Sequence, residues 1–258
     1  DLVALFDEAS AALGDFHQAL AFPVARVLQS PHFLFRAELG EPDPDAPGGR
    51  RFTSLEMASR LAFFLWNSGP DDELLAAGEA GELVTDAGLR AQAERLLADE
   101  RAKGALRNFF VEHLGLFALS DLPKDPTVFT HAAPELGPEA REETLRLIDH
   151  VVFELDTDFR SLFTTHTTFV NPRLATLYGV PAGAPSGFAQ IELPADGPRV
   201  GLLGHASILM TNAHAVSSSA TKRGAFIREA LLCDVIPPPP ADVDTSLPEP
   251  SGDRPTMR

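Results

Sequence analysis

The chain has 258 residues, 44% of them hydrophobic, which is enough to bury a sizeable core in one large domain or two small ones. Its formal net charge of −16 argues against nucleic-acid binding, because phosphate contacts need clustered Lys and Arg. A single cysteine, Cys233, excludes an internal disulfide and any CxxC motif, and no apolar run approaches the roughly 20 residues that span a bilayer.

Helical periodicity begins at the N-terminus. Apolar residues there recur every three or four positions and predict one buried helix face: Leu2, Leu5, Phe6, Ala9, Leu13, Phe16 and Leu20. Ser30-Pro31 is typical of an N-cap followed by the first residue of a helix. Residues 40–51 are polar and rich in Pro and Gly, and we expect a loop there.

A capping box starts the next helix. The Thr53 hydroxyl and the Glu56 carboxylate can each accept a backbone N–H of the other residue's turn, and we expect this helix to end near residues 67–70. Short helices are expected at residues 71–78, 86–99 and 101–114, with Gly115 as the stop and with Phe109, Phe110 and Leu114 in the core.

The second half of the chain carries similar signals. Pro138 opens a helix that should run to about Leu155, and Asn171-Pro172 starts a short helix that Gly179 closes. We further expect a short strand at residues 190–193 and two helices at residues 199–210 and 220–233.

These elements predict an all-α fold, an irregular multi-helix bundle with long Pro/Gly loops and an extended Pro-rich C-terminal tail. The predicted domains are an N-terminal helical segment at 1–40, a central helical domain at 52–180, a C-terminal helical hairpin module at 198–236 and a Pro-rich linker at 237–258.

Signals for catalysis or metal binding are weak. There is no HExxH, Glu-x-x-His, Gly-x-Ser-x-Gly, Walker or GxGxxG motif, so we predict no metal site and name no catalytic residue. The helix after Pro138 carries a charged stripe, which we interpret as a solvated face: Glu139, Glu142, Glu143, Arg146, Asp149 and Glu154.

The stretch from Arg199 to Arg228 is the exception, because it contains basic residues and no Asp or Glu in an otherwise acidic chain. Positive charge in the first turn of a helix, beside free backbone N–H groups and hydroxyls, is typical of an anion site. The anion could be a carboxylate, a phosphate, a haem propionate or an acidic side chain of this same chain. The candidate residues are Lys222, Arg223, Arg228, Ser219, Thr221, His214 and His205.

A series of motifs then occurs in order along nearly the whole chain: SPHFLFRAELG, FTSLEMASRLAFFLWNSGPDDELL, FFVEHLGL, SLFTTHTTFVNPRLATLYGVP and RVGLLGHASILMTNAHAVSSSATKRGAFIREALLCDVIPPPP. In this series the chain resembles exported, cytochrome c-associated multidomain proteins of planctomycete and myxobacterial type, whose consecutive domains have no known function. Relatives tend to carry Thr-Ser-Pro before Lys-Arg-Gly, whereas this chain has Ser219-Ala220-Thr221, so any role of that proline is absent.

The resemblance implies an extracytoplasmic location, either periplasmic, outer-membrane-associated or secreted. It also implies a haem c module with a CxxCH motif following this chain. The chain itself lacks CxxCH, so haem cannot be attached to it covalently, and we expect no cofactor in it. The expected partners are that haem-bearing module or an acidic protein.

The sequence therefore predicts a non-catalytic helical scaffold or partner module that supports electron transfer. The alternative is an extracytoplasmic hydrolase or oxidoreductase that acts on an anionic or polymeric substrate near Lys222 and Arg223, with His205 or His214 as base. A third reading is a structural module in which Lys222 and Arg223 each pair with a carboxylate of the same chain.

Overall fold

A computed structural model of the chain describes residues 1–238. Most of the predicted Pro-rich tail, from residue 239 onward, lies outside the described residues. The described part is mostly helical with two small two-stranded sheets, and this confirms the predicted irregular all-α class. It divides into two compact units: residues 1–64 with 68–96, and residues 65–67 with 97 onward. The domain boundaries predicted from the sequence differ from the boundaries of these two units, and they remain a prediction.

The first unit begins with a helical hairpin of α1 (Leu2–Leu13) and α2 (Phe16–Leu28), followed by the short α3 (Pro31–Leu34). Gly14 separates α1 from α2 because it adopts a left-handed conformation, with φ of 63°. The prediction of one buried face was wrong, since α1 has no buried residue and Phe16 is 59% exposed. These two short helices pack mainly on each other, which leaves much of their apolar surface uncovered.

The rest of this unit is a β-hairpin and three helices. The hairpin pairs β1 (Glu41–Pro42) with β2 (Arg50–Arg51) inside the segment predicted as a loop. Then follow α4 (Ser54–Trp66), α5 (Asp72–Glu79), a 3-10 turn η1 (Glu82–Val84) and α6 (Asp86–Leu97). The capping box is confirmed, because Glu56 accepts the Thr53 N–H at 2.8 Å and Thr53 accepts the Glu56 N–H at 3.2 Å.

Glu56 also joins the hairpin to α4. Its Oε1 accepts the backbone N–H of Leu39 at 2.7 Å and of Gly40 at 2.8 Å. Hydrogen bonds from the backbone of Gly40 and Thr53 lower the pKa of Glu56 to about 2, because they stabilise the charged carboxylate.

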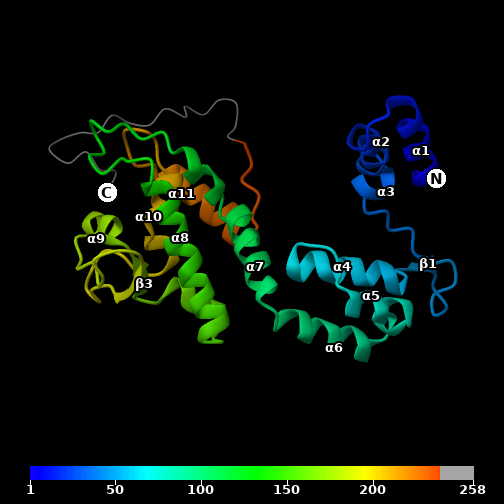
Figure 1. Ribbon diagram of the computed structural model, residues 1–258. Coiled ribbons are helices and arrows are strands. Elements are labelled where there is room, and N and C mark those ends of the chain that lie inside the picture. The colour runs from blue at the N-terminus through cyan, green and yellow to red at the C-terminus, as the bar shows by residue number, and fades with distance from the viewer. Residues whose placement is uncertain (239–258) are drawn as a thin grey trace. The chain divides into compact units, whose positions relative to one another are not determined.

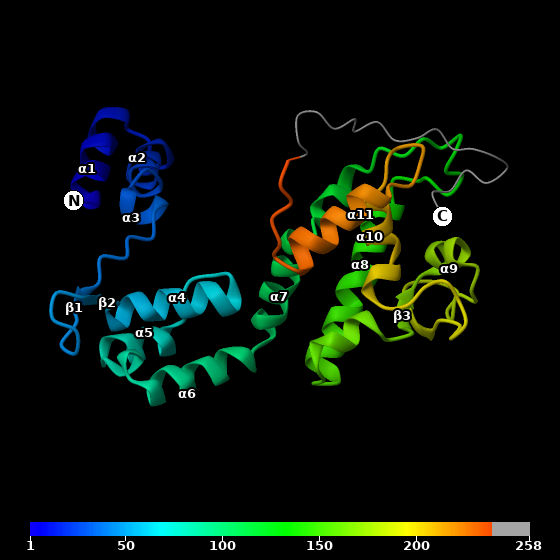
Figure 2. The same cartoon turned by 180° about the vertical axis from the view of Figure 1, so that it is seen from behind.

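The second unit is built around α8 (Leu136–Asp149), which continues as a π-helical turn, η3 (His150–Glu154). Before it come α7 (Glu100–His113) and the 3-10 segment η2 (Leu116–Asp121). Figures 1 and 2 both show α8 between α7 on one side and the β3 and α9 region on the other, and each of these elements contacts α8.

The chain then returns to α8 several times. A 3-10 turn η4 (Phe159–Phe163) leads to β3 (Thr167–Val170), which pairs antiparallel with β4 (Ala189–Glu192); α9 (Pro172–Tyr178) lies between the two strands. Strand β4 confirms the predicted strand, whereas β3 was not predicted. The C-terminal elements are η5 (Leu202–Gly204), α10 (Ala206–Thr211), α11 (Ala220–Phe226) and a π-helical turn η6 (Ile227–Leu231).

The helix predicted at 199–210 is therefore shorter than expected. Gly201 has a φ of 53° and packs so closely on η4 that a Cβ would lie 2.4 Å from the Phe163 carbonyl carbon. This close approach fixes an irregular backbone at the position where the sequence pattern predicts helix.

One apolar core fills the second unit, with Leu147, Ile148, Leu174 and Leu202 among its fully buried residues. Phe109 was predicted in the core but is 55% exposed, while Leu114 is buried as predicted. Within residues 1–238, every helix is too short or too polar to traverse a lipid bilayer.

Candidate functional site

Two residues of the charged stripe on α8 are buried, so its interpretation as a solvated face was wrong for them. Glu143 is 0% exposed and Asp149 is 3% exposed. Asp149 pairs with Arg107 of α7, whose Nη2 and Nε lie 2.6 Å and 2.8 Å from its Oδ2. Burial alone would lower the pKa of Arg107, but the hydrogen bond and charge of Asp149 raise it above its ordinary value.

Glu143 lies at the centre of a buried polar network. Its Oε1 accepts the Thr168 hydroxyl of β3 at 2.7 Å, and its Oε2 accepts the Tyr178 hydroxyl of α9 at 2.6 Å. Tyr178 in turn accepts the backbone N–H of Ala206 at 2.7 Å. The carboxylate thus joins three segments of the chain inside the core.

His205 extends the network on the other side of Thr168. Its Nδ1 lies 3.0 Å from the Thr144 hydroxyl, which lies 2.6 Å from the Ser207 hydroxyl, and its Nε2 lies 3.3 Å from the Thr168 hydroxyl. The Thr168 proton is donated to Glu143, so Thr168 can only accept from His205. This assigns the proton of a neutral His205 to Nε2 and lets Nδ1 accept from Thr144.

Burial explains the electrostatics of this network. It lowers the pKa of His205, and Arg199 acts in the same direction while Glu143 opposes it. Burial together with the negative charge of Glu143 raises the pKa of Tyr178 well above its ordinary value. We conclude that His205 is a neutral, hydrogen-bonded core histidine, and that Tyr178 keeps its proton as a donor to Glu143.

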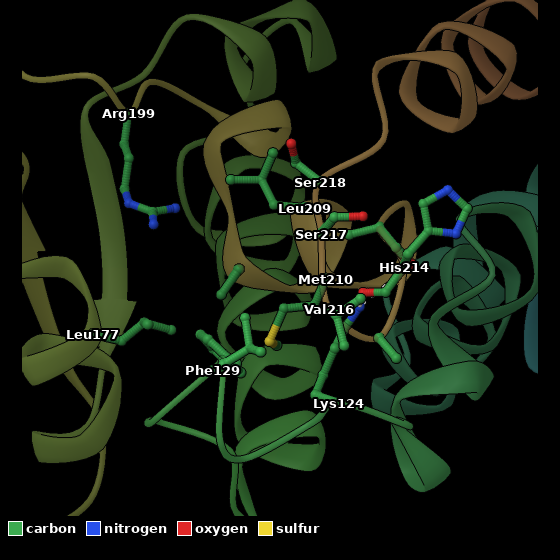
Figure 3. Close-up of a pocket in the computed structure, with 14 residues that line it drawn as sticks. Lys124, Phe129, Leu177, Arg199, Leu209, Met210, His214, Val216, Ser217 and Ser218 are labelled. Carbon is green, nitrogen blue, oxygen red and sulfur yellow. Dashed lines mark hydrogen bonds between the residues drawn. The ribbon is translucent and has the colours of Figure 1, made fainter. Parts of the chain in front are cut away.

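Arg199 connects this network to the surface. Its guanidinium carbon lies 4.2 Å from the centre of the Tyr178 ring, and its Nη1 donates to the Gly204 carbonyl at 2.6 Å. Arg199 also lines a pocket of about 280 Å³ together with His214 and Lys124 (Figure 3).

The remaining candidates lie on or just before α11. Ser219 is 7% exposed and is the N-cap, accepting the Lys222 N–H at 3.2 Å, whereas Thr221 and Lys222 are exposed on the helix. Arg223 donates through Nε to the Ser219 carbonyl at 3.3 Å. Arg228 is already paired, with its Nε 2.9 Å from the Asp234 carboxylate.

The structure thus separates the two candidate histidines. His205 is 1% exposed in the network, while His214 is exposed at the pocket and its ring points away from Arg199 (Figure 3). Within residues 1–238, neither Lys222 nor Arg223 forms an ion pair with a carboxylate, which the purely structural reading had required. Among the same residues, no group of three or more His, Cys, Asp or Glu side chains could hold a metal ion.

Sequence reasoning missed the network, although one signal pointed to Glu143. Ala140, Leu147 and Ile148 mark the buried face of α8, and Glu143 lies on that face at helical spacing. A carboxylate among apolar residues on a core-facing stripe calls for buried hydrogen-bond donors. No local signal indicates that these donors are Thr168 and Tyr178.

Fold and site together define an all-α protein whose core holds a carboxylate–histidine–tyrosine network. The family PSD4, described as a protein of unknown function (DUF1592), matches residues 52–180, and PSCyt3, also of unknown function (DUF1588), matches residues 199–258. The chain belongs to this family of consecutive domains of unknown function, which confirms the resemblance inferred from its motifs. No curated protein and no solved structure gave a significant match.

Proposed function

We propose that this chain is a non-catalytic helical partner module of an exported, cytochrome c-associated protein, and that its basic surface binds an acidic group of the partner. The observation that carries this proposal is that the positive charges of Lys222 and Arg223 are not neutralised by carboxylates of the described chain. Neither has a carboxylate partner within residues 1–238, in a chain whose formal net charge is −16.

A nearby lysine adds to the positive potential. Burial and the charge of Lys222 lower the pKa of Lys124, so the two ammonium groups lie close enough to repel each other. Like charges are costly unless an anion offsets them, and complementary charge increases the rate and specificity of association. A haem-bearing module is the partner that the family resemblance suggests, with a haem propionate or an acidic side chain as the bound group.

The enzymatic alternative has weaker support from the geometry. A general base must be able to reach the substrate proton. His205 is buried, and both of its ring nitrogens lie against threonine hydroxyls. His214 is exposed, but its ring points away from Arg199 across the pocket.

The test measures binding of the chain to an acidic c-type cytochrome from the same organism by calorimetric titration at low and high salt. We expect Lys222→Ala/Arg223→Ala to weaken binding by about tenfold at low salt, because two rim charges contribute about 1 kcal/mol or less each. The salt dependence of the affinity should fall as well.

The matched control, Arg160→Ala/Arg173→Ala, removes the same charge from two arginines that already pair with Asp158 and Glu139. We expect it to change the affinity by less than about threefold. Equal losses in the two double variants, or no binding by the wild-type chain, would contradict the proposal.

A further inference from the structure

The pocket beside Arg199 lies wholly within the second unit. Its walls come from the end of α9, from α10, from the loop at residues 213–218 and from the loop that carries Lys124 and Phe129. Figure 3 shows Arg199 and Leu177 extending into the space from one side, with Lys124 and Val216 on the opposite side. A volume of about 280 Å³ lies near the lower end of the roughly 300–1,000 Å³ that is typical of small-molecule sites.

One part of the wall is apolar. Leu177, Leu209, Met210 and Phe129 line the pocket, and Met210 is 8% exposed. Apolar walls with a few fixed polar groups are typical of small-molecule sites. A compact hydrocarbon or aromatic body would be desolvated against these side chains.

The polar groups of the pocket favour an anion. Arg199 is held in place by its stacking on Tyr178 and by the Gly204 carbonyl, and no acceptor among residues 1–238 engages its Nε or Nη2, so both can donate to a ligand. Lys124 donates to the carbonyls of His214 at 2.8 Å and of Ala213 at 3.3 Å, which keeps its ammonium at the opposite wall. Among the described residues that line the pocket there is no Asp or Glu.

The buried network fixes the position of Arg199. The Arg199 guanidinium lies over the face of the Tyr178 ring, and the Tyr178 hydroxyl is fixed by its hydrogen bonds to Glu143 and to the Ala206 N–H. A cation with a fixed orientation loses little conformational entropy on binding a carboxylate, which increases affinity.

We propose that this pocket binds a small organic carboxylate with an apolar body, its carboxylate oriented by Arg199 with Lys124 opposite and its body against Leu209 and Met210. This site adjoins the proposed docking surface at Lys124 but differs from it, because Lys222 and Arg223 do not line the pocket. It is also a site for a small molecule and not for a protein partner.

Calorimetric titration of the whole chain with benzoate and with hexanoate tests the proposal. At least one of them should bind with a Kd below about 1 mM, and at least tenfold more tightly than its uncharged counterpart, benzyl alcohol or 1-hexanol. Inorganic phosphate, which has the charge without the apolar body, should bind at least tenfold more weakly than that carboxylate.

Two variants locate the binding. Arg199→Gln and Lys124→Gln should each weaken carboxylate binding by about tenfold or more, while Arg173→Gln, an exposed arginine on α9 outside the pocket, should change it by less than about twofold. Thermal unfolding identifies any variant that fails to fold. If Arg199→Gln does not fold, the carboxylate affinity of Lys124→Gln tests the proposal instead.

Three outcomes would overturn the proposal. The first is a Kd above 1 mM for both carboxylates. The second is equal binding of the uncharged counterparts or of phosphate. The third is unchanged affinity in folded Arg199→Gln and Lys124→Gln.

Discussion

The two halves of the Arg199–Arg228 stretch have opposite surroundings. From Arg199 to Met210 the chain runs into the core, where His205 and Ser207 are buried at 1% and 0% exposure. From His214 to Arg228 it is mostly exposed, and only Ser219 is buried. One charge pattern in the sequence therefore spans a buried network and a solvent-facing basic surface. Histidine has a different role in each half, because His205 is buried in the network and His214 is exposed.

The largest expected effect separates the two histidines. His205→Ala should reduce the free energy of unfolding by about 3 kcal/mol, because it leaves a cavity and deprives Thr144 and Thr168 of a partner. His214→Ala should change it by less than about 0.5 kcal/mol, since its side chain is exposed. Urea unfolding followed by the fluorescence of Trp66, the single tryptophan, measures both.

The stability that His205 contributes should also depend on pH. Because the pKa of His205 is lowered in the folded state, the unfolded chain binds more protons below its ordinary value of 6.5. The contribution of His205 is therefore complete above pH 6.5 and is lost as the pH falls below it. The gap between wild type and His205→Ala should narrow in that direction; a gap that is small at pH 7, or that widens on acidification, contradicts a neutral buried His205.

A smaller effect is expected for the hydroxyl of Tyr178. Tyr178→Phe keeps the ring beneath Arg199 but leaves the Ala206 N–H and one Glu143 oxygen without their partner, which should cost about 2 kcal/mol. Urea unfolding gives the loss, and amide hydrogen exchange should show weaker protection at Ala206. Thr176→Val, which alters an exposed hydroxyl on the same helix, is the control and should cost less than about 0.5 kcal/mol. Equal losses would place Tyr178 outside any buried network.

The smallest expected effect concerns the exposed half. Ser219→Ala removes the N-cap of α11 and should cost about 1 kcal/mol, with faster amide exchange at Lys222. Ser219→Asp should keep most of that stability, because Asp also caps helices. The neighbouring Ser218→Ala should have little effect on unfolding, as Ser218 is exposed and makes no cap. If Ser218→Ala were as harmful as Ser219→Ala, the assignment of the cap would be wrong.

Local signals in the sequence predicted local structure well. The Ser30 cap, the Thr53–Glu56 capping box and the Asn171 cap with Gly179 as stop are all confirmed. Each of these depends on residues within a few positions of one another, so tertiary contacts are not needed to recognise them.

The missed features depend on contacts between distant segments. Glu143 was assigned to a solvated face because its partners, Thr168 and Tyr178, lie 25 and 35 residues further along the chain. The exposure of Phe16 and Phe109 likewise depends on which elements pack over them, and residue type alone does not decide this. The sequence indicated the basic segment as a candidate site, but the pocket required the fold to bring Arg199 and Lys124 to one cavity.

The hydrogen bonds of the buried network also bear on how the chain folds. Thr144 and Ser207 are 63 residues apart, and Tyr178 and Ala206 are 28 apart, so each bond joins the segment that matches PSD4 to the segment that matches PSCyt3. Contacts this far apart in the chain form only when the intervening elements are ordered, which makes their formation slow and cooperative. We therefore expect residues 97–180 and 199–238 to gain and lose their structure in a single transition. A polypeptide that ends between them would keep Thr144 and Tyr178 in its core without the His205 ring, the Ser207 hydroxyl and the Ala206 N–H that complete their hydrogen bonding.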